Sequence, residues 1–198
     1  MAPLLDDLEL HDALPRARFR ELHRRNVDRP IEQVWPAALA VTGSEIRTLG
    51  PLFALRGLPR RLLGGRPPQA SEPRPLLELF VREGFIVLRR DERPVDGRAV
   101  VIFGAAGRFW SPTDNSPIRF GDPASFLACD TPDRAVTVAR LEAIAEGGRT
   151  RLETETLVAG TDRGAELKFA PYWGLIRYPS GLIRRSWLAA IDRRAQRG

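Results

Sequence analysis

The C-terminal stretch from Thr161 to Arg197 constrains the fold more than any other part of the chain. At about 100° per residue, its apolar residues fall into one stripe along a helix. Asp162 is in position to cap the first turn, and Pro171 and Pro179 predict bends in the axis. We therefore expect a long, bent helix whose aromatic face lies against a large apolar surface. The residues of this face are Phe169, Tyr172, Trp173, Ile176, Ile183, Trp187, Ala190 and Ile191, with Ser180 in the same phase.

The segment from Arg16 to Asp28 predicts a strand because its residues alternate between two faces. One face is mostly charged and should lie in water, and the other must then face the interior with Glu21 and His23. Polar groups are tolerated in an interior only when they are hydrogen-bonded, so these two residues predict a polar pocket or a paired site. The outer face carries Arg18, Arg20, Leu22, Arg24 and Asn26, and the inner face carries Ala17, Phe19, Glu21, His23, Arg25 and Val27.

Two helical segments are predicted to follow this strand. Asp28 is a candidate N-cap and Pro30 suits the first turn of a helix that Gly43 ends. A second short helix is predicted within residues 44–65, where Gly57–Leu58–Pro59 ends it, and residues 64–75 are the most loop-like segment of the chain. The apolar stripe of the first helix is Ile31, Val34, Trp35, Ala38 and Val41.

Beyond Pro75 the apolar period shortens, which predicts a run of antiparallel strands. Gly104 and Gly107 lie inside one of these strands and predict a bulge or bend that lets the sheet curl. The predicted elements are helical turns at 76–83 and 122–130, strands at 84–90 and 95–110, and a hairpin of 134–145 with 149–160.

These elements predict an α+β fold, in which a curled antiparallel sheet wraps around the long C-terminal helix and two short helices follow the first strand. A bent sheet and a straight helix do not fill space uniformly. We therefore expect a cavity between them.

Four stretches resemble the START-like helix-grip superfamily, also called SRPBCC or polyketide cyclase/dehydrase-like, and in particular a bacterial branch of it. They are Arg20–Leu39, Gly107–Trp110, Arg151–Thr156 and Tyr172–Leu188. The resemblance implies one helix-grip domain over residues 1–198, with residues 1–15 as a poorly ordered or accessory lead-in. It also implies a cavity for a hydrophobic ligand, since members include lipid and sterol carriers, hormone sensors and polyketide cyclases. The superfamily has no shared catalytic motif to transfer to this chain.

The candidate ligand-binding residues are those expected on the inner faces of the sheet and helix or where the two meet. Glu21 and His23 are also the best candidates for acid–base catalysis, with Arg108, Tyr172 and Tyr178 as possible carbonyl or oxyanion partners. The structural alternative is that Glu21, His23 and an arginine form a network beneath the helix. The full set of candidates is Glu21, His23, Arg108, Trp110, Thr154, Thr156, Tyr172 and Trp173.

Enzyme signatures are missing from the sequence: it has no Gly-x-Ser-x-Gly elbow, no P-loop and no His-Glu-x-x-His motif. His11 and His23 are the only histidines, which excludes a multi-histidine metal site, and the lone Cys129 excludes a thiolate zinc site. We expect neither a metal nor a cofactor. The predicted function is binding or carrying of a hydrophobic or amphipathic small molecule, and the alternative is a polyketide cyclase/dehydrase-type enzyme using polar residues of the same cavity without a metal.

The formal net charge of +6 comes from 31 basic and 25 acidic residues, and Lys168 is the only lysine among the basic ones. Such a skew toward arginine reflects genome composition more often than phosphate binding, so we expect a solvated basic surface and no specific nucleic-acid partner. No apolar run is long enough for a membrane span. We expect a cytoplasmic protein that is a monomer or a weak homodimer.

Overall fold

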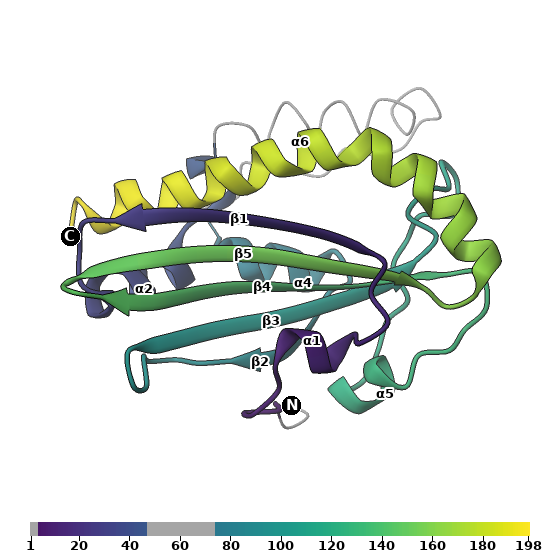
Figure 1. Ribbon diagram of the computed structural model, residues 1–198, viewed down its shortest axis with the longest axis horizontal. Helices are drawn as coiled ribbons and strands as arrows, with labels where there is room; N and C mark the ends of the chain where they lie inside the picture. Colours follow the sequence, from purple (N-terminus) through teal and green to yellow (C-terminus); the bar gives the residue numbers. More distant parts are fainter. Residues whose placement is uncertain (1–3, 47–73) are drawn as a thin grey trace.

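The structure is a computed structural model that describes residues 4–46 and 74–198. Its centre is a five-stranded antiparallel sheet, and a long C-terminal helix lies along one face of it (Figure 1). The α+β class predicted from the sequence is confirmed. The strands are β1 (Phe19–Val27), β2 (Ile86–Arg90), β3 (Arg98–Gly107), β4 (Ala135–Glu146) and β5 (Arg149–Gly160), in the sheet order β1-β5-β4-β3-β2.

The helices divide between the two faces of the sheet. We call the face that carries α2, α4 and α6 the helix face, and the one that carries α1 and α5 the opposite face (Figure 1). The helices are α1 (Leu10–Ala13), α2 (Ile31–Ala40), α4 (Leu76–Arg82), α5 (Pro123–Leu127) and α6 (Arg163–Ala195), with a 3-10 turn η1 (Gly43–Glu45).

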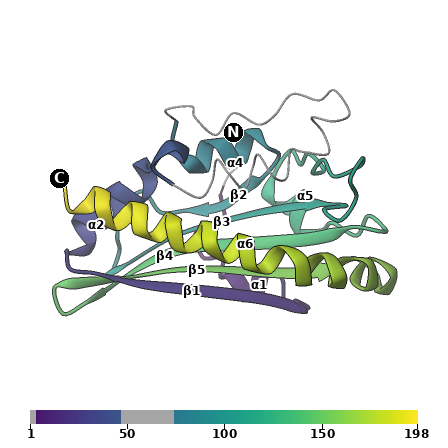
Figure 2. The same ribbon diagram turned by 90° about the horizontal axis from the view of Figure 1, so that it is seen from above.

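Helix α6 confirms the prediction made from the C-terminal stretch. It has 33 residues and begins where the Asp162 carboxylate accepts a hydrogen bond from the backbone N–H of Ala165 at 2.8 Å. Pro171 and Pro179 both lie inside it. Seen from above, α6 runs along β1 and β5 for most of its length (Figure 2). The edge strand β1 and its neighbour β5 are therefore the strands whose side chains meet this helix.

The β4–β5 hairpin is also as predicted. Glu146 and Arg149 pair at its end, and Gly147 and Gly148 form the turn with φ of 57° and 83°. Two consecutive positive φ angles suit glycine and match the right-handed twist of the strands. The hairpin fixes the register of β5 and thus the direction in which Thr154 and Thr156 point.

A bulge or a bend was predicted at Gly104 and Gly107, and the structure contradicts the bulge. The pairing of β3 with β4 runs through both glycines without a shift, and the irregularity lies in β2 between Val87 and Arg89. Gly104 has a packing reason instead: a Cβ there would lie 2.3 Å from Cζ of the Phe126 ring. The glycine makes room for α5 to pack on the opposite face.

The start of α2 also differs from the prediction. The N-cap residue is Pro30, with no side-chain cap, and the Asp28 carboxylate instead pairs with Arg149 Nε at 2.9 Å. The predicted apolar stripe of α2 is buried as expected, from Ile31 to Val41. The predicted second helix (within 44–65) and loop (64–75) lie largely outside the described residues. The described residues at the start of this stretch belong to the turn η1.

The sheet has an apolar core on each face. On the helix face, the C-terminal half of α6 packs on α2 and the sheet through Trp187, Leu188 and Ile191. On the opposite face, Leu10 of α1 and Phe126 of α5 cover Val100 and Ile102. A third, aromatic cluster lies beneath the first turns of α6. The candidate site lies on the helix face between this aromatic cluster and the core around Trp187.

Candidate functional site

Six polar side chains gather between the sheet and the middle of α6, and we call them the inner polar cluster. Glu21 and His23 come from β1, and the antiparallel register sets them opposite Thr156 and Thr154 of β5. Ser180 and Arg184 belong to α6. Arg184 joins the helix to the sheet, because it donates hydrogen bonds to Ser180 of α6 and to Thr156 of β5. The cluster is Glu21, His23, Thr154, Thr156, Ser180 and Arg184. Four of its six members were predicted from the alternation of β1 and β5.

Glu21 and His23 form a hydrogen-bonded pair. His23 Nε2 lies 2.9 Å from Glu21 Oε1, and the imidazole donates because an ionised carboxylate can only accept. Their side chains are 15% and 14% exposed, so the pair is mostly covered yet remains in contact with solvent. A Glu–His pair in this setting can bind a polar group or exchange a proton with one.

Arg184 brings a cation to the same place. Its Nη1 donates to Thr156 Oγ1, and its Nε donates to Ser180 Oγ at 3.3 Å. Desolvation lowers the pKa of Arg184 to about 10, against the opposing attraction of the Glu21 carboxylate. At neutral pH the guanidinium therefore remains charged and balances Glu21.

Sequence reasoning had placed only an unnamed arginine in this network. The signal for Arg184 was available, because it lies four residues after Ser180 and three before Trp187. Those spacings put it on the inward stripe of α6.

Two polar atoms of the inner polar cluster have no hydrogen-bond partner among the described residues. They are Glu21 Oε2 and Thr154 Oγ1, and both are buried. Buried polar atoms are nearly always satisfied in folded proteins, because leaving one unpaired costs about 1–3 kcal/mol. The cluster therefore contains one unused acceptor, the Glu21 carboxylate oxygen, and one unused hydroxyl group, that of Thr154.

The aromatic residues predicted at the site lie together under the N-terminal half of α6. Phe169 is the centre of this cluster, with ring centroids 5.6 Å from Tyr172, 6.0 Å from Trp173 and 6.3 Å from Trp110. Phe19 of β1 completes it at 5.1 Å. Since Phe19 and Glu21 are on the same face of β1, the aromatic cluster adjoins the inner polar cluster.

Arg108 and Tyr178, two of the predicted polar partners, do not contact the Glu21–His23 pair. Arg108 follows the end of β3 and binds the Asp133 carboxylate, and its Nη1 lies 3.3 Å from Asp114 Oδ2. Tyr178 is on the outward side of α6 and is 68% exposed. Neither is therefore in position to assist Glu21 and His23. Arg108 instead connects the β3 end to the loop before β4.

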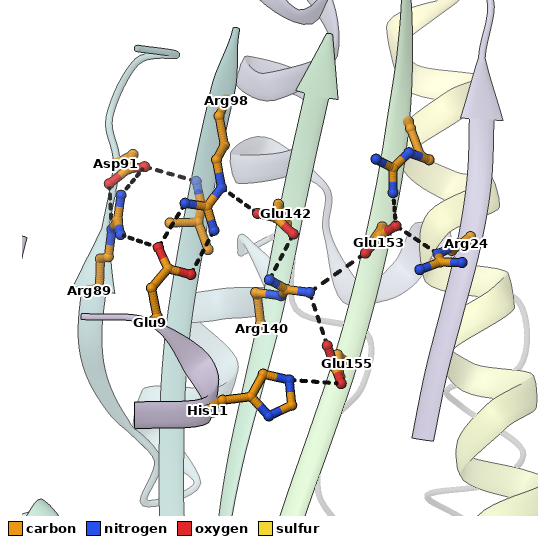
Figure 3. Close-up of polar contacts among 12 residues, drawn as sticks. Glu9, His11, Arg24, Arg89, Asp91, Arg98, Arg140, Glu142, Glu153 and Glu155 are labelled. Carbon is orange, nitrogen blue, oxygen red and sulfur yellow. Dashed lines mark hydrogen bonds and ion pairs between the residues drawn. The ribbon is translucent and has the colours of Figure 1, made fainter. Parts of the chain in front are cut away.

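A polar network with more residues than the inner polar cluster lies on the opposite face, and the sequence analysis did not predict it (Figure 3). The face of β1 with Arg20 and Arg24 is exposed as expected, but these two arginines also bind Glu155 and Glu153 of β5, whose carboxylates are buried. Arg140 of β4 binds both of these carboxylates and that of Glu142. The cause is the register, which brings the alternating Arg and Glu of β4 and β5 together on one face.

The lead-in to α1 lies over this network (Figure 3). Both Glu9 oxygens accept from Arg98 at 2.7 Å, and His11 Nε2 lies 3.6 Å from Glu155 Oε1. The hydrogen bonds from Arg98 lower the pKa of Glu9 despite partial desolvation. Since each buried carboxylate here is bound by at least one arginine, we interpret the network as structural and the inner polar cluster as the candidate site.

A groove opens on the helix face at the other edge of the sheet. It has a volume of about 280 Å³ and lies between α4, β2 and β3. Its lining residues are Arg74, Leu77, Glu78, Val81, Arg82, Val87, Arg90 and Val101. None of the predicted ligand-binding residues lines this groove. It is therefore separate from the inner polar cluster.

Across residues 4–46 and 74–198, no group of three or more His, Cys, Asp or Glu side chains is arranged to hold a metal ion. Within the same residues, no helix is long and apolar enough to cross a membrane.

Comparison with known proteins does not assign the chain to a family. No family model matches it, and no curated protein matches it. Among solved structures, the crystal structure of TTHA0849 from Thermus thermophilus is similar, with 13% sequence identity over 90% of this chain and 97% of that chain and a TM-score of 0.28. A similarity of this size supports no conclusion about fold or function.

Proposed function

We propose that the protein binds a hydrophobic or amphipathic small molecule between the sheet and α6, in a helix-grip fold whose sheet curls around that helix. The observation that carries the proposal is the unused hydrogen-bonding capacity of Glu21 Oε2 and Thr154 Oγ1 next to an aromatic cluster. An apolar body would lie against the aromatic rings, and one polar end would complete the inner polar cluster.

The charges of the cluster favour a neutral polar end. Glu21 and Arg184 already balance each other, so a carboxylate on the ligand would add an uncompensated charge. Glu21 Oε2 needs a donor, whereas the Thr154 hydroxyl can donate or accept. A hydroxyl group satisfies both, and we therefore propose an apolar alcohol rather than a fatty acid as the ligand class.

A competition assay tests this proposal. A neutral fluorescent probe, N-phenylnaphthylamine, would be displaced by decanol, decanoate or decane, which differ only in the end group. We expect decanol to displace it best, and Thr154→Val to remove the preference for decanol without lowering thermal stability. Failure to bind the probe, or equal displacement by all three compounds, would contradict the proposal.

Acid–base catalysis in the same site is the second candidate, of the cyclase/dehydrase type. The observation that favours it is the partly solvent-exposed Glu21–His23 pair, since the carboxylate orients the ring and His23 Nδ1 has no hydrogen-bond partner among the described residues. In such a reaction His23 would accept a proton from the bound compound and return it, while Arg184 balances the charge of Glu21. Conversion of the bound compound by wild type but not by His23→Gln would support it.

The cytoplasmic location and the monomer or weak homodimer remain predictions. Gel filtration and fractionation of cells that produce the protein would test them.

A further inference from the structure

The outward side of α6 carries large apolar side chains in water. Leu167, Leu175 and Tyr178 are 67%, 75% and 68% exposed. Their spacings of eight and eleven residues place them within about 80° of one another around the helix. We call these three residues the outer stripe of α6. Exposed apolar residues are ordinary when scattered, but a stripe on one helix indicates a surface that is covered by a partner.

The charges beside the outer stripe are positive. Arg163 and Arg185 are exposed on the side of α6 that carries the outer stripe, and Arg177 is exposed at its edge. None of the three makes an ion pair within the part of the chain that the structure describes. Arg177 stacks over the Tyr178 ring, with its guanidinium carbon 5.1 Å from the ring centroid. Glu166, which precedes Leu167 in the chain, is paired with Arg18 at 3.3 Å.

We infer that the outer stripe of α6 docks the protein on an anionic lipid surface. A helix that lies in a membrane interface buries apolar side chains among the acyl chains while its basic residues bind the lipid headgroups. The outer stripe and its three arginines match both parts of that surface. This inference does not depend on the ligand proposed under α6.

Other occupants fit the outer stripe less well. A second copy of this chain would bring the arginines of both helices together without an acidic counterpart. Nucleic acid would match the arginines but has no apolar interior for Leu167 and Leu175. An anionic bilayer supplies both negative charge and an apolar phase.

Flotation of the full chain with lipid vesicles tests the inference. We expect binding to vesicles that contain phosphatidylglycerol and little or none to pure phosphatidylcholine, with affinity falling as salt rises. Leu175→Asp should weaken binding by about tenfold or more, the scale expected from burying one leucine side chain. Leu167→Asp is a second variant of the same kind, and Arg177→Gln with Arg185→Gln should remove the preference for anionic lipid.

Val95→Asp is the matched control, because Val95 is 68% exposed at the turn before β3, away from α6. All three aspartate variants should melt like wild type, since the original side chains are in water. Absence of wild-type binding to anionic vesicles would overturn the inference, and so would equal losses in Leu175→Asp and Val95→Asp. A wild-type dimer in sedimentation velocity that Leu175→Asp dissociates would assign the outer stripe to a second copy instead.

Discussion

Gly181 of α6 lies directly over the Glu21 carboxylate of β1. A Cβ at this position would be 2.7 Å from Glu21 Oε1 and 3.1 Å from His23 Nε2. The helix thus approaches the inner polar cluster so closely that only a glycine leaves the Glu21–His23 hydrogen bond undisturbed.

Gly181→Ala should therefore displace Glu21 from His23. Alanine favours a helix interior over glycine by about 0.8–1.0 kcal/mol, but here the gain is offset by the disturbed pair. Gly174→Ala is the control, because a Cβ there meets nothing within 4 Å. We expect only Gly174→Ala to stabilise the protein, and only Gly181→Ala to shift the NMR signals of the His23 ring. Equal stabilisation with unchanged His23 signals would mean that α6 does not pack on the pair.

Trp187 anchors the C-terminal half of α6. It is 3% exposed, and its ring meets Phe80 edge-on at 6.0 Å. Trp187→Ala should lower the free energy of unfolding by about 3–5 kcal/mol, as expected for deleting a large buried aromatic side chain. Tyr178→Ala on the same helix should change it by less than about 0.5 kcal/mol. Urea denaturation measures both, and a loss under about 1 kcal/mol for Trp187→Ala would show that the helix is not packed on this core.

Arg140 is the hub of the network on the opposite face. Removing it leaves Glu142, Glu153 and Glu155 with fewer cations in a buried setting. Breaking a buried ion pair costs about 3–5 kcal/mol, and we expect the lower end for Arg140→Ala because each carboxylate retains another arginine. Arg149→Ala removes an exposed pair with Asp28 and should cost less than about 1 kcal/mol. Similar losses for both variants in chemical denaturation would argue against a buried network.

Glu9 predicts part of the response to acid. The hydrogen bonds from Arg98 lower its pKa below the ordinary value of 4.5, so the ionised form stabilises the folded state. This stabilisation is complete above about pH 4.5 and is lost as the pH falls through the lower, folded-state pKa. Glu9→Gln should therefore reduce stability at pH 7 and flatten its decline below pH 4.5.

The effect is modest because the Glu9 side chain is 40% exposed. Urea midpoints at pH 7, 5 and 3 measure it, with Glu32→Gln on the exposed side of α2 as the control. A decline in acid that is as steep in Glu9→Gln as in wild type would contradict the role assigned to Glu9.

The sequence predicted those features that local patterns determine. The Asp162 cap, the aromatic stripe of α6 and the β4–β5 turn all depend on residues close together in the chain, and each is confirmed. The alternation of residues along β1 was sufficient to predict that Glu21 and His23 lie on the same side of the strand, where they form a hydrogen bond. Period alone thus identified the strand that carries the candidate site.

The features that were missed depend on contacts between distant segments. The burial of Glu153 and Glu155 requires the register of β4 with β5 and the arginines of β1, and a single strand does not reveal it. Gly104 was interpreted as a bulge or bend because the Phe126 ring that packs against it comes from a later helix. Arg184 follows the helical period, but its hydrogen bond to Thr156 depends on how α6 packs on β5, which the period does not determine.

Native mass spectrometry of the purified protein tests the ligand proposal most directly, with His23→Ala beside wild type and His11→Ala as the control on the opposite face. We predict that wild type and His11→Ala carry the added mass of an apolar alcohol, and that His23→Ala loses it while keeping most of its thermal stability. The contradicting result is equal ligand content in the folded fraction of all three proteins, with His23→Ala destabilised by about 3–5 kcal/mol, as expected for a purely structural buried pair.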